Sequence, residues 1–331
     1  MSQIPEYIHN WIKIIEEMVN DNTYKLAWGR AIIECSRDKA YQNGTKLVIK
    51  YDDISECMLK YYWNQIFFFN LKQAPYIDKE PYICQYTKEL IEKYKELKNS
   101  TIPCWFEDAR IFFDKKDKAF YDKIIRKISK VLPTNVAYRF LNVNKTEDNP
   151  SGCLKVYRFE KGLDYIEFNY DELELLRDFD VIISKLLNYK WAQLLEKFNY
   201  APKIASKVNG ISEAKLRRNS LVKYKEALLK EFEGKKPIDF YTGKELKKDD
   251  ISVDHVIPWS FMYSDDIWNL VLTSKSKNSS KSNRIPSKED IDKLKKRNEK
   301  LKDLLEDKLK EDLELSIKAD LVTKYYYDCR L

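Results

Sequence analysis

Glycine is scarce in this chain, with only 7 among 331 residues. Loops that cradle a nucleotide phosphate need several closely spaced glycines, so the sequence excludes a Gly-rich phosphate-binding loop. The 6 cysteines are scattered, and none forms a Cys-x-x-Cys pair. This argues against a zinc ribbon and against a disulfide framework, so we expect reduced and mostly buried thiols.

The sequence also lacks an apolar run of membrane-spanning length. Glu6, Glu16 and Glu17 stand where a signal peptide would be basic and then apolar. With 44% hydrophobic and 34% charged residues, the composition is that of a soluble globular protein. We therefore predict a cytoplasmic protein without a membrane partner. The net charge of +7 suits an anionic partner, although solubility alone explains it equally well.

Apolar residues at helical spacing predict that most of the chain is helical. Helices are expected over residues 5–19, 26–32, 79–98, 171–197, 212–232 and 288–321. Residues 103–130 alternate aromatic and basic residues and are the candidate of the N-terminal half for a phosphate-facing surface, with ordinary solvated lysines as the alternative. An aromatic stretch at 58–69 is read as a buried helix, with base stacking as the open alternative. Strands are expected at 46–50 and, as a hairpin, at 154–159 and 163–170, with a loop at 142–152.

A domain boundary is predicted near residue 205, because Pro202 and Gly210 interrupt the helical pattern. Residues 1–205 would form a mostly helical recognition or regulatory domain, and residues 206–331 a second domain. The helix predicted at 212–232 is basic and carries Lys215, Arg217, Arg218, Lys223 and Lys225. The leucine stripe at 301, 305, 309 and 313 winds around its helix, so that helix should pack back on the protein or on a partner subunit.

The most informative polar residues lie between 239 and 287. One of only two histidines, His255, directly follows Asp254, and Asn269 and Asn278 come later in the same stretch. Hydrolysis of a phosphodiester needs oxygen ligands for a metal and a base for water, and these residue types supply both. An Asp-His dipeptide alone is more often a buried polar pair, but the two asparagines favour a catalytic site.

This stretch resembles the HNH, or ββα-metal, endonuclease family, and is most similar to the HNH domain of RNA-guided CRISPR DNA nucleases. The matching residues are Tyr241, Thr242, Gly243, Lys244, Val253, Asp254, His255, Asp265, Ile267, Asn269, Val271, Leu272, Thr273, Lys277, Asn278, Lys281, Ser282, Pro286 and Ser287. The resemblance implies a two-stranded hairpin followed by a helix. Residues 241–244 would be a turn, 251–256 a strand and 267–272 the start of a helical segment. Residues before 205 resemble no family.

The resemblance also assigns roles. Asp254 and Asn278 would hold Mg²⁺, which prefers oxygen ligands, with Mn²⁺ as a substitute. His255 would be the general base, because a histidine with an ordinary pKa of about 6.5 is available as a neutral imidazole near pH 7. Its side chain is expected to project opposite to that of Asp254. Asn269 would complete the catalytic set by steadying the loop that carries the histidine.

Residues 271–287 contain cations and no acid, which predicts contact with the nucleic-acid backbone through Lys275, Lys277, Lys281 and Arg284. No structural zinc is expected, since no cysteine lies between Cys153 and Cys329. Asp239 and Phe240 stand where relatives often carry a cysteine. Packing of the apolar residues Phe240, Trp259, Phe261 and Trp268 is therefore expected to hold the hairpin.

Together these features predict an α+β, mainly helical protein: a helical domain with a small β-hairpin, then a ββα-metal nuclease domain and a C-terminal helix. The expected function is metal-dependent hydrolysis of DNA in restriction, phage defence or a mobile element. Two alternatives stay open: a catalytically silent nucleic-acid-binding subunit, and a non-specific nuclease effector gated by a partner. A partner protein or homo-oligomer also stays open.

Overall fold

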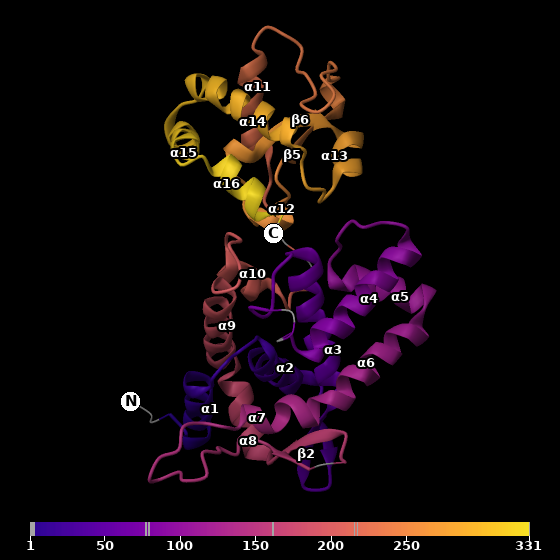
Figure 1. Cartoon of the computed structure of the whole chain (residues 1–331), viewed down its shortest axis with the longest axis vertical. Coiled ribbons are helices and arrows are strands. Elements are labelled where there is room, and N and C mark those ends of the chain that lie inside the picture. Colours follow the sequence, from indigo (N-terminus) through magenta and orange to yellow (C-terminus); the bar gives the residue numbers. More distant parts are fainter. Residues whose placement is uncertain are drawn as a thin grey trace. The chain divides into compact units, whose positions relative to one another are not determined.

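A computed structural model describes residues 4–76, 78, 80–160, 162–214, 216 and 218–330. The chain forms two compact units (Figure 1). The helical unit comprises residues 1–199 and 204–215, and the hairpin unit comprises residues 200–203 and 216–331. The fold is α+β and mainly helical, as the sequence predicts. Among the described residues, no helix has the length and apolar character needed to cross a membrane.

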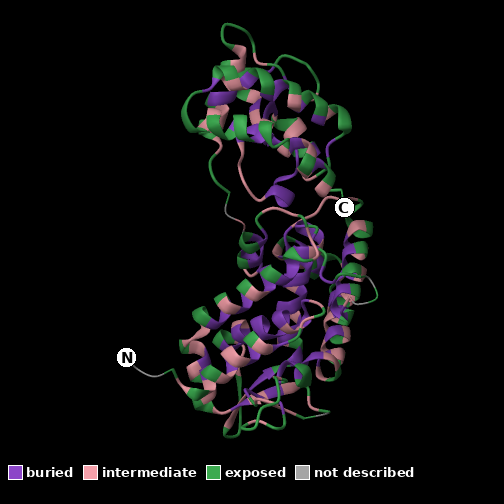
Figure 2. Ribbon diagram, turned by 60° about the vertical axis from the view of Figure 1, so that its left-hand side comes forward, coloured by how far each residue is buried: buried purple, intermediate pink, exposed green. Residues whose placement is uncertain are grey.

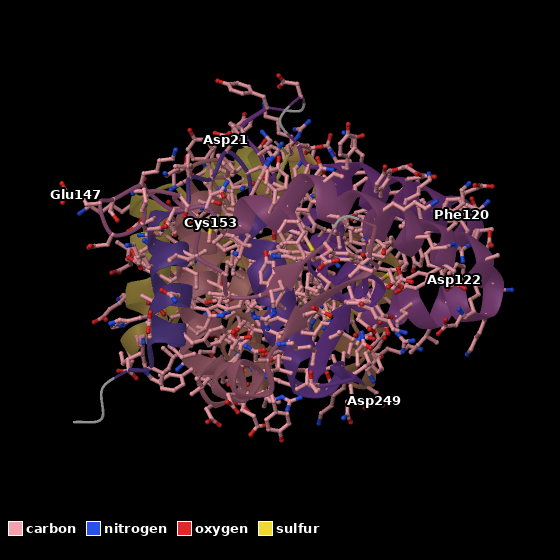
Figure 3. All side chains as sticks on the ribbon, turned by 90° about the horizontal axis from the view of Figure 1, so that it is seen from below. Asp21, Phe120, Asp122, Glu147, Cys153 and Asp249 are labelled. Atoms are coloured by element: carbon pink, nitrogen blue, oxygen red, sulfur yellow. The ribbon has the colours of Figure 1, made fainter. Side chains whose placement is uncertain are left out.

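The helical unit contains one small sheet. Its helices are α1 (Glu6–Glu17), α2 (Tyr24–Asp38), α3 (Tyr51–Trp63), α4 (Tyr82–Lys98), α5 (Phe106–Lys116), α6 (Lys118–Leu132), α7 (Tyr138–Phe140), α8 (Tyr170–Asp178), α9 (Asp180–Glu196) and α10 (Ile204–Gly210). The sheet is antiparallel, in the order β1 (Tyr41–Asn43), β2 (Lys46–Lys50), β4 (Tyr165–Phe168), β3 (Arg158–Phe159). The predicted hairpin is thus present in shortened form and joins β2. Glu147, on the predicted loop 142–152, projects outward (Figure 3).

Aromatic side chains fill the core of the helical unit. Tyr61 and Tyr62 on α3 are fully buried and face Trp191 on α9, with ring centroids 6.0 and 6.5 Å apart. Buried residues line the inward sides of these helices (Figure 2). Because the rings pack against one another inside the core, the 58–69 stretch is a buried helix, and the base-stacking alternative is wrong.

Two helices predicted as continuous are interrupted. Residues 171–197 break at Phe179, whose ψ of 9° leaves the helical range and separates α8 from α9. The 288–321 helix is divided into α14 (Lys288–Leu301), a 3₁₀ turn η7 (Lys302–Leu304) and α15 (Asp307–Lys318), and α16 (Leu321–Asp328) follows. Apolar spacing continues across such breaks because both halves cover the same core, so periodicity alone did not reveal them.

The basic helix predicted at 212–232 is much shorter, since only α11 (Val222–Leu229) and the 3₁₀ turn η4 (Lys230–Phe232) form. The Ser220 hydroxyl accepts from the Val222 N–H, a local hydrogen bond that competes with a helix, and Asn219 donates to the distant Asp265. Lys215 and Arg217, assigned to this helix from the sequence, lie outside the described residues.

The hairpin unit is built on two strands, β5 (Ile251–His255) and β6 (Leu270–Ser274). They pair antiparallel from Ile251 opposite Ser274 to His255 opposite Leu270. Short elements adjoin them: η5 (Lys248–Asp250), α12 (Trp259–Met262), η6 (Ile267–Asn269) and α13 (Lys275–Lys281). The expectation that 267–272 begins a helical segment is wrong, because residues 270–273 are buried as a strand. The helix starts later, where the Ser274 hydroxyl caps the Lys277 N–H at 3.2 Å.

A single hydrophobic core supports the hairpin. Phe240, Phe261 and Trp268 belong to it, as predicted, together with Leu301 and Leu313 of the C-terminal helices. The leucine stripe therefore packs back on its own unit. Trp259 is buried but packs against Tyr263, with ring centroids 4.9 Å apart. The outer helices thus fix the two strands that carry the candidate site.

Candidate active site

Strand β5 ends in the two residues singled out from the sequence, Asp254 and His255. Both are buried, with 6% and 8% of their surface exposed, and both line one pocket of about 210 Å³. Asn278 on α13 lines the same pocket. The expected projection of Asp254 and His255 to opposite sides stays a prediction, because two residues that line one pocket can reach it from different directions.

The Asp254 carboxylate is held through one of its two oxygens. Oδ2 accepts a hydrogen bond from the Tyr241 hydroxyl at 2.5 Å and lies 3.1 Å from Lys281 Nζ. Burial, followed by the negative charge of Asp254, raises the pKa of Tyr241 far above its ordinary value, so this hydroxyl keeps its proton. Neither contact involves Oδ1, which leaves that oxygen available as a metal ligand.

His255 is paired with an acid that was not assigned a role from the sequence. Its Nε2 lies 2.9 Å from Oδ1 of Asp265, a residue of the same pocket. Burial acts to raise the pKa of Asp265, but its hydrogen bonds with His255 and Asn219 outweigh that effect and lower it. An ionised Asp265 favours the tautomer with the proton on Nε2, so Nδ1 is the nitrogen that can accept a proton.

Asn278 is oriented by strand β5. Its Nδ2 donates to Ser252 Oγ at 2.8 Å and to the Val253 carbonyl at 3.1 Å. Because the amide nitrogen is used in this way, Oδ1 is directed to the other side of the group. Asp254 and Asn278 therefore offer a carboxylate and an amide oxygen from two elements that line one pocket, a donor set that suits Mg²⁺.

A metal at this pocket would need further ligands from water or substrate. Within the described ranges, no group of three or more His, Cys, Asp or Glu side chains is arranged to hold a metal ion. Mg²⁺ tolerates such sites, because it usually keeps several waters and is bound by one or two carboxylates together with substrate phosphates. The residues present thus fit a weakly held ion rather than an enclosed structural metal.

Asn269 is fully buried and fixes the segment after His255. Its Oδ1 accepts from the Ile257 N–H at 2.8 Å, and its Nδ2 donates to the Ile257 carbonyl at 2.9 Å. Its own carbonyl accepts from the Val256 N–H at 2.9 Å. This is the geometry of a residue that positions the histidine loop, and its catalytic importance stays a prediction.

Asp239, at the position where relatives often carry a cysteine, holds the turn before β5. Its Oδ1 accepts from the N–H groups of Tyr241 and Thr242, and its Oδ2 accepts from Thr273 Oγ1 and the Ser274 N–H, all within 2.8–2.9 Å. Burial tends to raise its pKa, but these hydrogen bonds dominate and lower it. A carboxylate therefore ties the turn to β6, in addition to the packing expected from the sequence.

The four cations proposed to contact a nucleic-acid backbone differ in exposure. Lys275 and Arg284 are exposed and Lys277 is half-buried, with its Nζ 5.7 Å from the centre of the Tyr241 ring. Lys281 is buried, and its Nζ donates to the His255 carbonyl at 2.6 Å besides contacting Asp254. Another cation, Arg218, lines the active-site pocket with its guanidinium 4.5 Å from the Trp259 ring centre.

The two-stranded hairpin, the following helix, and an acid, a histidine and an asparagine around one pocket define the architecture of a ββα-metal nuclease domain. A sequence profile of the HNH endonuclease family matches residues 239–287. This segment therefore belongs to the HNH endonuclease family.

The chain is similar to CRISPR-associated endonuclease Cas9 of Streptococcus mutans serotype c (strain ATCC 700610 / UA159). The two are 45% identical over 60 residues, which are 17% of this chain and 4% of the Cas9 protein. The similarity thus supports a Cas9-like motif within a chain that spans only a small part of that relative. No solved structure matches this chain significantly.

Proposed function

We propose that this protein is a metal-dependent endonuclease that hydrolyses phosphodiester bonds in DNA. The observation that carries the proposal is the convergence of Asp254, His255 and Asn278 on one pocket. The HNH family of residues 239–287 and the similarity to an endonuclease support the class of reaction. The net charge of +7 and the exposed cations near the pocket support an anionic polymer as substrate.

Asp254 and Asn278 would hold the metal, Mg²⁺ or Mn²⁺, through the oxygens that their other contacts leave available. When bound, the ion supplies Lewis-acid polarisation of the phosphate and stabilises negative charge on it. Tyr241 and Lys281 would keep the Asp254 carboxylate oriented beside the substrate.

His255 would take the proton of the attacking water at Nδ1. Asp265, at Nε2, holds the tautomer that leaves Nδ1 unprotonated and stabilises the positive imidazolium formed by the transfer. Asn269 keeps the backbone after the histidine in place. Lys275, Lys277 and Arg284 would contact the DNA backbone outside the pocket, and Arg218 would contact it at the pocket.

We further propose a cytoplasmic protein acting in restriction, phage defence or a mobile element, with residues 1–205 choosing the target or sensing a trigger. A partner protein or a second copy of the chain would act through that region. This biological role is supported by the HNH family match and the Cas9-like motif.

The test is cleavage of supercoiled plasmid by the purified full chain with Mg²⁺, Mn²⁺ or EDTA. We expect nicked or linear product with either metal, none with EDTA, and a loss on the order of 1,000-fold in His255→Ala, because a positioned base contributes about 100- to 10,000-fold. His9→Ala is the matched control, since His9 is the only other histidine and is exposed on α1.

Cleavage that persists in His255→Ala would contradict the assignment of the base. Intact plasmid under every condition, together with metal-independent DNA binding in a gel-shift assay, would favour the silent binding subunit. Activity that emerges only when a second protein is added would favour the gated effector.

A further inference from the structure

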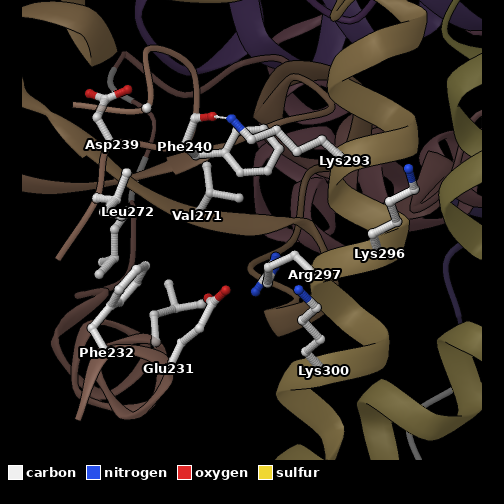
Figure 4. A pocket seen from close by; sticks show the side chains of 13 residues that line it. Glu231, Phe232, Asp239, Phe240, Val271, Leu272, Lys293, Lys296, Arg297 and Lys300 are labelled. Atoms are coloured by element: carbon white, nitrogen blue, oxygen red, sulfur yellow. Dashed lines mark hydrogen bonds between the residues drawn. The ribbon is translucent and has the colours of Figure 1, made fainter. Parts of the chain in front are cut away.

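A second pocket of the hairpin unit shares no lining residue with the active-site pocket. It has a volume of about 480 Å³, within the range of sites that bind small molecules. Its walls come from α11 with η4, from the turn before β5, from β6 and from α14 (Figure 4). Nothing in the proposed cleavage reaction uses it.

The two sides of this second pocket differ in chemistry. Leu228, Phe232, Phe240, Val271 and Leu272 supply an apolar wall. Opposite them, α14 contributes four cations, Lys293, Lys296, Arg297 and Lys300. Their spacing of three and four residues places them on one face of the helix. A ligand that fits both walls carries an apolar body and a negative charge.

Among the four cations of this wall, Arg297 is the one that most needs a hydrogen-bond acceptor. Only 7% of its surface is exposed, and it points into the pocket (Figure 4). Its Nη2 donates to the Leu270 carbonyl at 2.6 Å, whereas Nε and Nη1 find no acceptor in the part of the chain that the structure describes. A buried cation with unused donors is unfavourable unless an anion or acceptor meets it.

Two acids lie at the pocket, and neither serves as that partner in this structure. Asp239 already uses both carboxylate oxygens on the turn and on β6. Glu231 faces Arg297 from η4 (Figure 4). Burial raises the pKa of Glu231, although the positive charges of Arg297 and Lys300 act to lower it. A bound anion would share the cations with Glu231, so Glu231 sets how tightly the pocket holds it.

We propose that this pocket binds a small amphipathic anion, whose apolar body lies against the Phe232, Phe240 and Leu272 side. Its single carboxylate or phosphate group meets Arg297, Lys296 and Lys300, because Lys293 already donates to the Phe240 carbonyl. The site is independent of the nuclease proposal, and its test needs no cleavage assay.

The test is isothermal titration calorimetry of the full chain with four probes. Decanoate and decyl phosphate carry the body and an anionic head, decanol carries the body alone, and acetate carries the head alone. We expect saturable one-to-one binding of decanoate or decyl phosphate, whichever head fits, and at least tenfold weaker binding of decanol and acetate. The better of the two anions identifies the head group.

Variants assign the binding to the pocket. Arg297→Gln should weaken the anion at least tenfold, because charge-assisted hydrogen bonds are removed. Glu231→Gln should tighten it severalfold, because a competing negative charge disappears. Lys295→Gln is the matched control, since Lys295 is on the same helix but contacts Asp320 and Thr323 outside the pocket. Ile238→Glu, at an exposed position of the pocket wall, is a second blocking variant if Arg297→Gln fails to fold.

Absence of binding by both anions up to millimolar concentration would overturn the proposal. Equal affinity for decanol and decanoate would overturn it too, because the cations would then play no part. Unchanged affinity in Arg297→Gln and Ile238→Glu would place the binding elsewhere. Weaker binding in Glu231→Gln would show that Glu231 supports the pocket and does not compete with the ligand, and would also count against it.

Discussion

Buried polar side chains serve different ends in the two units. In the helical unit, Asn64 lies fully inside the core, where its amide donates to the Ile211 carbonyl and accepts from the Phe106 N–H. In the hairpin unit, Asp254 and His255 are almost as buried but line a pocket, and each keeps an atom that its contacts with the described residues leave unused. Burial alone therefore does not identify function. The distinguishing feature is an unused donor or acceptor beside open space.

Asp239 is the strongest test of this comparison, because it is a buried acid of the hairpin unit that we expect to be purely structural. Asp239→Ala leaves four donors without an acceptor and should lower the free energy of unfolding by about 4 kcal/mol. Urea denaturation of wild type and variant measures the difference. A loss of cleavage without a loss of stability would place Asp239 in the catalytic machinery.

The same residue predicts a pH dependence. Its pKa is lowered in the folded state from the ordinary 3.8, so its contribution is fully present above that value and is lost as pH falls through the folded pKa. The stability difference between wild type and Asp239→Asn should therefore be constant near neutral pH and shrink in acid. A difference that grows as pH falls would contradict the assigned shift.

Two asparagines give a matched pair across the units. Asn64→Ala should lower the free energy of unfolding by about 3 kcal/mol, because two buried backbone groups lose their partners, while the folded fraction cleaves normally. Asn278→Ala should instead impair cleavage, with little change in the free energy of unfolding. Loss of a metal ligand is expected to lower cleavage by about 100-fold or more at fixed Mg²⁺, with DNA affinity retained.

Cleavage rates across a Mg²⁺ series, together with gel-shift affinities, separate the two effects. Asn283→Ala is the control for Asn278, since Asn283 lines the same pocket but is not proposed as a ligand. Normal cleavage by Asn278→Ala would remove this residue from the metal site.

Asp265→Asn addresses a residue that acts through His255. Without a negative charge at Nε2, the histidine loses its fixed tautomer, and we expect cleavage to fall by about 10- to 100-fold with a changed pH profile. Asp266→Asn is the control, because the Asp266 carboxylate accepts from Ser264 at 2.5 Å instead. Equal effects of the two substitutions, or an unchanged pH profile in Asp265→Asn, would argue against a positioning role.

The sequence predicted part of this fold and part of this site, for physical reasons. Helical faces and β2 followed from apolar patterning, whereas the break at Phe179 did not, because both α8 and α9 cover one core. Residues 270–272 were misread as helical because a fully buried strand lacks the alternation of an exposed one. Asp254, His255 and Asn278 were singled out through the family resemblance, and all three line one pocket, while their roles stay predictions. The pairing of Asp265 with His255 depends on how the chain folds between them.

The smallest expected effect concerns the cations beside the site, and the structure changes which ones to alter. Lys281 is buried on Asp254 and His255, so the accessible set is Lys275, Lys277 and Arg284. Changing these three to glutamine should weaken DNA binding. It should also reduce the slope of log binding constant against log salt concentration by up to about 3, close to one for each phosphate that is no longer neutralised. The control is the change of Lys302, Lys308 and Lys318 to glutamine, which removes the same charge elsewhere in the unit. If both sets flatten the salt dependence equally, net charge and not this surface holds the DNA.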